Sequence, residues 1–123
     1  MATPFVYKCE LDRVVDGDTV DVNLDLGFSI ILAKQRVRLV GIDTPESRTR
    51  DLAEKKLGLQ AKDLLTELCC DGFVLESQGK GKYGRILGVL WDHDGNNINQ
   101  KLIKAGLAVE YWGGTKTKVW GDY

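Results

Sequence analysis

The stretch Arg36–Glu46, with the sequence RVRLVGIDTPE, constrains the fold of this chain more than any other. Its β-branched residues favour a stiff, extended backbone that leads into a turn fixed by proline. An unbroken strand would place Arg38 and Asp43 on opposite faces, but Gly41 allows a bulge that brings them to the same side. A carboxylate suited to a metal ion and a guanidinium suited to a phosphate would then share one pocket.

Hydrophobic patterns predict a mainly β chain with helices, of the α+β class. The expected strands are residues 5–15, 20–24, 30–42, 73–77 and 86–91, with a tight Asp-Gly turn at 16–17, a second turn at 25–28 and a short extended piece at 107–109. An amphipathic helix is expected from 57 to about 70, with Leu57, Ala61, Leu64, Leu65 and Leu68 on its apolar face, and a second at 98–105, with Ile98, Leu102 and Ala105 inward. Residues 47–56 are polar and are expected to form a surface loop. Five strands with a helix between the third and fourth predict a five-stranded barrel of the oligonucleotide/oligosaccharide-binding (OB) kind.

The chain has 123 residues, enough for one domain, which we place at 1–112 and follow with a tail at 113–123. No secretory signal pattern precedes the first strand, so we expect a soluble intracellular protein without membrane association. Cys9, Cys69 and Cys70 are expected to be buried thiols rather than redox or zinc ligands. The net charge of −1 hides an acidic segment at 1–26 and a basic one at 34–62. This asymmetry fits an acidic metal cradle beside a basic substrate surface, and it equally fits ordinary solvated faces.

The sequence argues against two common kinds of functional site. The only histidine, His93, is expected in a turn between two aspartates. The sequence therefore argues against mechanisms that need a histidine base or paired histidine ligands. The segment 79–84 reads G-x-G-x-x-G, but a strand rather than a helix is expected after it, which argues against a dinucleotide site. It is better interpreted as a basic connection that delivers Arg85 to the start of a strand.

The remaining motifs combine into a site for phosphate chemistry. The turn Asp16–Thr19 is a weak signal alone, since any tight hairpin uses Asp-Gly. Together with Asp43–Glu46 it supplies oxygens from separate segments, as a hard divalent cation requires, and leaves positions open for a phosphate. Arg38 and Arg85 would add planar, always-charged forks for the phosphate oxygens.

Four blocks of the sequence resemble the staphylococcal (thermo)nuclease family, in the family's order. They are VDGDTV at 15–20, RLVGIDTPE at 38–46, KYGR at 82–85 and LIKAGLA at 102–108. The resemblance spans roughly residues 5–112 and implies a five-stranded barrel with peripheral helices. The family has a third, C-terminal helix, which we do not expect here because no helical period follows residue 113.

The resemblance also implies a function, Ca²⁺-dependent hydrolysis of DNA and RNA that leaves 3′-phosphate ends. Matched by position, the resemblance implies that calcium is bound by Asp18, Asp43 and the Thr44 carbonyl, with Asp16 nearby. It implies that Glu46 is the base or water-orienting group and that Arg38 and Arg85 bind the phosphate. The implied substrate contacts are Lys82, Tyr83 and one of Tyr111 and Trp112. Ca²⁺ is expected rather than Mg²⁺, although first principles do not choose between them.

Two functions therefore fit the sequence. The first is an active metal-dependent endonuclease, expected to be a monomer that takes DNA, RNA or both as substrate. The second is a module of the same fold that binds nucleic acid or protein without turnover. None of the acids or arginines implied by the resemblance is missing from the sequence, which favours the enzyme.

Overall fold

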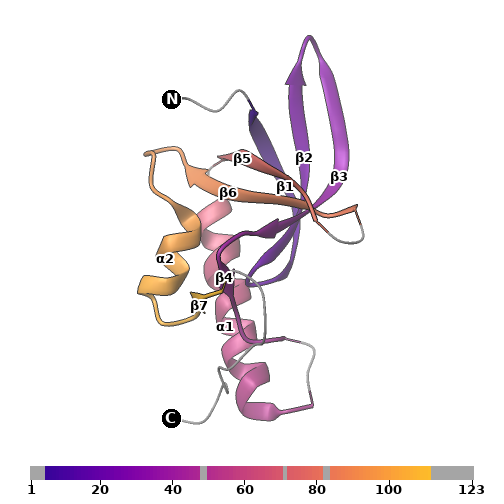
Figure 1. Cartoon of the computed structure of the whole chain (residues 1–123). Coiled ribbons are helices and arrows are strands. Elements are labelled where there is room, and N and C mark those ends of the chain that lie inside the picture. Colours follow the sequence, from indigo (N-terminus) through magenta and orange to yellow (C-terminus); the bar gives the residue numbers. More distant parts are fainter. Residues whose placement is uncertain (1–4, 48–49, 71, 82–83, 112–123) are drawn as a thin grey trace.

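The computed structural model describes residues 5–47, 50–70, 72–81 and 84–111, and in these ranges it forms a closed five-stranded barrel with two helices. The elements are β1 (Val6–Asp16), β2 (Thr19–Gly27), β3 (Ile30–Leu39), β4 (Ile42–Asp43), α1 (Leu52–Cys69), β5 (Phe73–Lys80), β6 (Ile86–Asp92), α2 (Ile98–Lys104) and β7 (Val109–Glu110) (Figure 1). The barrel order is β1-β2-β3-β6-β5, and β4 pairs with β7 separately. The predicted fold class and the five-stranded barrel are confirmed.

The first three strands form an antiparallel meander, as predicted. Asp16 of β1 pairs with Thr19 of β2, so only two residues make the turn between them. The β2–β3 hairpin projects beyond the barrel, and its tip carries Phe28 and Ser29 in the left-handed backbone region (Figure 1). The barrel closes where β3 runs parallel to β6. Alternation in β2 places its apolar residues in the core, because successive side chains of a strand point to opposite faces; the buried ones are Val20, Val22 and Leu24.

The strand expected to run unbroken from 30 to 42 is wrong at its end. It stops at Leu39, and Ile42–Asp43 forms the separate strand β4, antiparallel to β7. Gly41 has φ +78°, a conformation that favours glycine and turns the chain away from the barrel ladder. The short extended piece expected at 107–109 overlaps this partner, β7, at Val109 alone.

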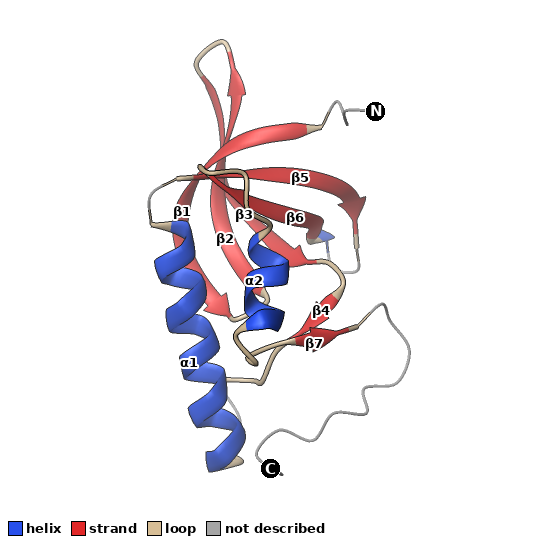
Figure 2. Ribbon diagram, turned by 90° about the vertical axis from the view of Figure 1, so that its left-hand side faces the viewer, coloured by secondary structure: helices blue, strands red, loops and turns tan. Residues whose placement is uncertain are grey.

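The surface loop expected at 47–56 is also partly wrong, because α1 begins at Leu52. The Asp51 side chain caps the helix by accepting from the amides of Ala53 and Glu54, at 3.0 and 3.2 Å. This first part of the helix carries no apolar stripe and is largely solvent-facing, so hydrophobic periodicity did not reveal it. Farther along, Ala61 and Leu65 are fully buried, as the predicted apolar face requires. Both helices lie on one side of the barrel (Figure 2).

Helix α2 joins the barrel through a buried polar side chain. The predicted cap of this helix is confirmed: the Asn97 side chain accepts from the Gln100 amide at 3.1 Å. Ala105 is wrong as an inward residue: it is the exposed C-terminal cap. Asn99 is buried instead, where it accepts from the Leu90 amide at 3.2 Å and donates to the Val40 carbonyl at 2.9 Å. One side chain thus ties β6 to the turn after β3.

The three cysteines differ in exposure, so the expectation of three buried thiols is wrong for one of them. Cys9 and Cys69 are buried, whereas Cys70 is exposed, and all three are free thiols. Burial raises the pKa of Cys9 and of Cys69 to about 12. Since the thiolate is the reactive form, both should be inert near neutral pH.

A labelling experiment checks this arrangement. Iodoacetamide at pH 8 is expected to modify the native protein once, at Cys70, and the urea-unfolded protein three times. Intact-mass spectrometry followed by peptide mapping counts and locates the adducts. Rapid labelling of Cys9 or Cys69 in the native state would contradict their burial against the barrel.

No helix in the described ranges is long and apolar enough to cross a bilayer. The expected tail at 113–123 and the expected absence of a third helix lie outside the described residues. The domain boundary at residue 112 stays a prediction.

Candidate nuclease site

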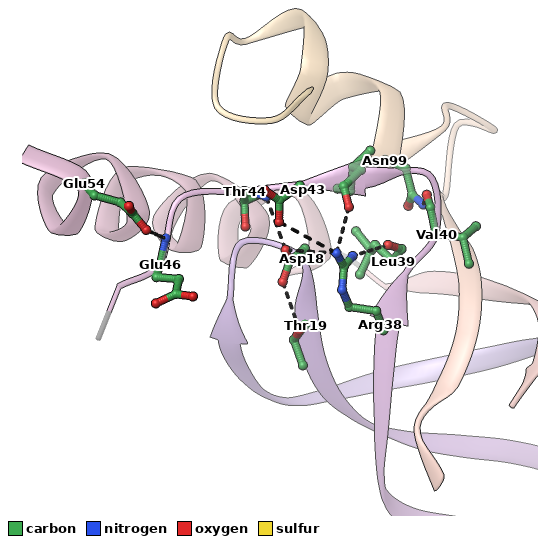
Figure 3. A network of polar contacts seen from close by, with 11 residues as sticks. Asp18, Thr19, Arg38, Leu39, Val40, Asp43, Thr44, Glu46, Glu54 and Asn99 are labelled. Carbon is green, nitrogen blue, oxygen red and sulfur yellow. Dashed lines mark hydrogen bonds and ion pairs between the residues drawn. The ribbon is translucent and has the colours of Figure 1, made fainter. Parts of the chain in front are cut away.

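Asp18, Arg38 and Asp43 come together from three segments of the chain (Figure 3). Arg38 Nη2 lies 3.4 Å from Asp18 Oδ2 and 4.0 Å from Asp43 Oδ1. All three side chains are largely shielded, with exposed fractions of 15% for Arg38, 12% for Asp18 and 7% for Asp43. Two carboxylates and one guanidinium therefore form a compact cluster with one excess negative charge.

The turn after β3 explains how Arg38 reaches these acids. The left-handed Gly41 redirects the chain, and the carbonyls of Leu39 and Ile42 both accept from the Arg38 guanidinium. Arg38 and Asp43 thus lie on the same side, as the sequence predicted from the glycine. The guanidinium lies directly against the Asp18 carboxylate.

Asp18 is held rigidly by neighbouring groups. One carboxylate oxygen accepts from the Thr19 hydroxyl at 3.0 Å and the other from the Thr44 amide at 3.2 Å. Its own carbonyl accepts from the Leu39 amide at 2.8 Å, which joins the β1–β2 turn to the end of β3. The Thr44 hydroxyl is buried and has no hydrogen-bond partner among the described residues. It lies close to the β1–β2 turn, since a β-carbon at Gly17 would be 3.1 Å from it.

Asp16 is tied to a different neighbour. It accepts from both the amide and the hydroxyl of Ser47, the amide at 3.3 Å. It also lines a hollow of about 440 Å³ with Val15, Thr19, Arg36 and Arg85. The structure therefore places Asp16 and Arg85 together, beside the start of β2.

Glu46 follows the acid cluster along the chain but is not part of it. Its side chain is exposed, and its carboxylate lies apart from Asp18, Asp43 and Arg38 (Figure 3). Its amide donates to Glu54 of α1 at 3.0 Å, which anchors the backbone at this position to the helix. Within the described ranges, no group of three or more His, Cys, Asp or Glu side chains is arranged to hold a metal ion.

A second hollow has Arg38 in its lining. It measures about 350 Å³ and is mainly apolar, with Arg38, Leu39, Val40, Gly41, Ile42, Gln78, Leu87 and Tyr111 around it. The Tyr111 amide donates to the Gly41 carbonyl at 3.0 Å, so this aromatic residue is fixed against the β3–β4 turn. Lys82, Tyr83 and Trp112, the other expected substrate contacts, lie outside the described residues.

Comparison with known proteins assigns the family. The profile described as "Staphylococcal nuclease homologue" matches residues 36–119, more than half of the chain. The chain belongs to the staphylococcal nuclease family. The matched region includes the end of β3, all of β4 and both helices, and strands β5 and β6 of the barrel, so the resemblance noted from the motifs is confirmed.

Individual relatives of this family agree. The chain is 32% identical to endonuclease YhcR of Bacillus subtilis over 86% of its own length and 9% of that protein. It is 35% identical to an uncharacterized endonuclease of Escherichia coli, over 80% of this chain and 58% of the relative. It is 33% identical to the thermonuclease of Staphylococcus hyicus, over 78% and 54% respectively. The chain thus spans little more than half the length of the relatives it matches, or less.

Several residues that support the site were missed from the sequence. Ser47 holds Asp16, Glu54 holds the Glu46 amide, and Asn99 binds the turn that carries Arg38 toward the acids. Gly58 of α1 lies so close to Glu46 that a β-carbon there would be 2.4 Å from the Glu46 carbonyl oxygen. A glycine inside an amphipathic helix is the one signal that could have been noticed, because it usually has a packing reason.

Proposed function

We propose that this protein is a Ca²⁺-dependent nuclease that hydrolyses phosphodiester bonds of DNA, RNA or both. The observation that carries the proposal is the buried cluster of Asp18, Asp43 and Arg38, whose arginine also lines a hollow, in a chain of the staphylococcal nuclease family. Names of relatives agree, since two are endonucleases and one is a thermonuclease. Burying a cluster with excess negative charge costs free energy unless a positive charge balances it.

The chemistry of the donor set fits a hard divalent cation. Asp18 and Asp43 offer carboxylate oxygens, and Thr44 offers a buried hydroxyl without a partner among the described residues, beside its backbone carbonyl. Two carboxylates and neutral oxygens leave coordination positions for water and a phosphate, whereas a site for zinc would need nitrogen or sulfur ligands. When bound, Ca²⁺ supplies positive charge that stabilises a phosphate as negative charge builds up on it.

Side chains of the protein itself bind the phosphate, accept the proton and hold a base. Arg38 and Arg85 bind phosphate oxygens with fixed, charged donors, which helps most when those oxygens gain charge in the transition state. Glu46 accepts a proton from the attacking water or orients it, because a carboxylate can serve as a general base. Water then adds to phosphorus and the bond to the 5′ oxygen breaks. The 5′ oxygen takes a proton from solvent to become a hydroxyl, and a 3′-phosphate end remains. Tyr111 and the apolar hollow hold a base.

Digestion of single-stranded DNA, plasmid DNA and RNA tests the proposal. Cleavage is expected with Ca²⁺ and not with EGTA. Glu46→Gln is expected to lower the rate by about 10²-fold or more, because the amide cannot take a proton. Glu67→Gln, an exposed position on α1, is the matched control and should stay within about twofold of wild type. Equal digestion by the Glu46 variant and wild type would remove Glu46 from the mechanism.

Metal binding has a readout that does not depend on turnover. Ca²⁺ that binds the native state alone raises the melting temperature as its concentration exceeds Kd. That rise is expected for the wild type and not for Asp43→Asn. Absence of both digestion and a calcium-dependent shift would favour the alternative, a non-catalytic module, which a gel-shift assay with the same nucleic acids would then test.

A further inference from the structure

Two arginines share one aspartate on the outer face of the β1–β2–β3 sheet. Asp21 Oδ1 lies 2.9 Å from Arg36 Nε, and Asp21 Oδ2 lies 3.1 Å from both Arg36 Nη2 and Arg13 Nε. One negative charge therefore faces two positive ones, which leaves the group with an excess positive charge. None of the three residues belongs to the acid cluster around Arg38.

Arg36 is positioned by this arrangement more firmly than an ordinary surface arginine. Two of its five N–H donors are committed to the carboxylate in a fork, which fixes the plane of the guanidinium. The hydrogen bond from Arg36 holds the pKa of Asp21 below its usual value, and Asp21 in turn raises the pKa of Arg36. The pair therefore stays charged at neutral pH.

The position of Arg36 relates it directly to the candidate nuclease site. It lines the hollow of about 440 Å³ together with Asp16 and Arg85. Val37 and Leu39 of β3 are buried, so Arg36 and Arg38 occupy successive outward positions of the same strand. Alternate residues of a strand are separated by about 6.7 Å, on the scale of neighbouring phosphates in an extended nucleic-acid strand.

We propose that Arg36, oriented by Asp21, forms a subsite for the phosphate adjacent to the cleaved one in a nucleic-acid strand, in the same hollow as Arg85, which is proposed to bind the cleaved phosphate. The inference rests on the proposed nuclease function. Arg36 would then strengthen the binding of strands of several nucleotides and would not affect the binding of a substrate with a single phosphodiester. The protein should accordingly prefer oligonucleotides to such a minimal substrate.

Steady-state kinetics with two substrates tests this subsite. Arg36→Gln is expected to raise KM for an eight-nucleotide single-stranded DNA by about three- to tenfold and to leave kcat unchanged. For thymidine 5′-(p-nitrophenyl phosphate), which has one phosphodiester, both constants should match wild type. Lys104→Gln on α2 is the control for the loss of one positive charge, and Arg36→Lys should recover part of the affinity. Urea unfolding of each variant separates a binding defect from a folding defect.

Equilibrium binding gives a second readout that needs no cleavage. With a fluorescent eight-nucleotide DNA in EGTA, Arg36→Gln should reduce the slope of log Kd against log salt by about 0.7, the value of one phosphate contact on a single strand. An unchanged slope and an unchanged KM ratio between the two substrates would overturn the proposal. Lack of cleavage by the wild type would refute the nuclease function, and the salt slope would still decide the role of Arg36.

Discussion

Replacing Arg38 with alanine is expected to lower the rate of phosphodiester cleavage by about 10³-fold or more, as for other arginines that stabilise phosphoryl transfer. The same change should lower the free energy of unfolding by about 3 kcal/mol, because it leaves buried charges without their partner. One guanidinium nitrogen lies near both Asp18 and Asp43, and the guanidinium also binds the carbonyls of Leu39 and Ile42. Initial rates on single-stranded DNA at saturating Ca²⁺ measure the first effect, and urea unfolding measures the second.

Two further variants separate the roles of Arg38. Arg38→Lys keeps the charge between the acids but not the planar fork, so it should recover much of the stability and little of the rate. Arg85→Ala should lower the rate by about as much as Arg38→Ala, since both are expected to bind phosphate. A rate for Arg38→Ala within a few-fold of wild type would rule out its catalytic role, and unchanged stability would contradict the ion pairs described above.

Elements with a regular hydrophobic pattern were predictable because the pattern is a local property. The alternation of β2 and the apolar stripe of α1 each specify one buried face, and both faces are buried as expected. The approach of Arg38 to Asp43 was predictable for the same reason, since Gly41 is the one residue between them that readily adopts a positive φ. The family motifs added the order of the segments.

The parts that the sequence did not predict depend on contacts between distant segments. Nothing near Ser47 indicates that its hydroxyl will hold Asp16, which comes 31 residues earlier. Asn99 is polar on an otherwise apolar helix face, and only the packed structure shows that it binds the backbone of two other segments. The first part of α1 was missed because the start of the helix is set by the Asp51 cap rather than by burial.

Gly58→Ala is the second substitution with a large expected effect, and it links α1 to the site. In an isolated helix this change should stabilise, since alanine is better than glycine by about 1 kcal/mol. Here the new β-carbon would lie 2.4 Å from the Glu46 carbonyl oxygen and 2.7 Å from the Ser47 amide nitrogen. Both are backbone atoms that cannot rotate away, so the 46–47 segment or the helix must move. A net loss of about 2 kcal/mol in unfolding free energy is expected.

The displaced segment carries both Glu46 and Ser47, and Ser47 in turn holds Asp16. A shift of about 1 Å in such a group can cost about 10²-fold in rate, so Gly58→Ala should be impaired well beyond its loss of stability. Rates are compared at a temperature where urea curves show the variant fully folded. Gln60→Ala, exposed on the same helix, is the control and should change stability by less than about 0.5 kcal/mol. A stabilised Gly58 variant would show that α1 does not approach the 46–47 backbone closely. A destabilised variant with full activity would show that this approach supports the fold but does not position Glu46.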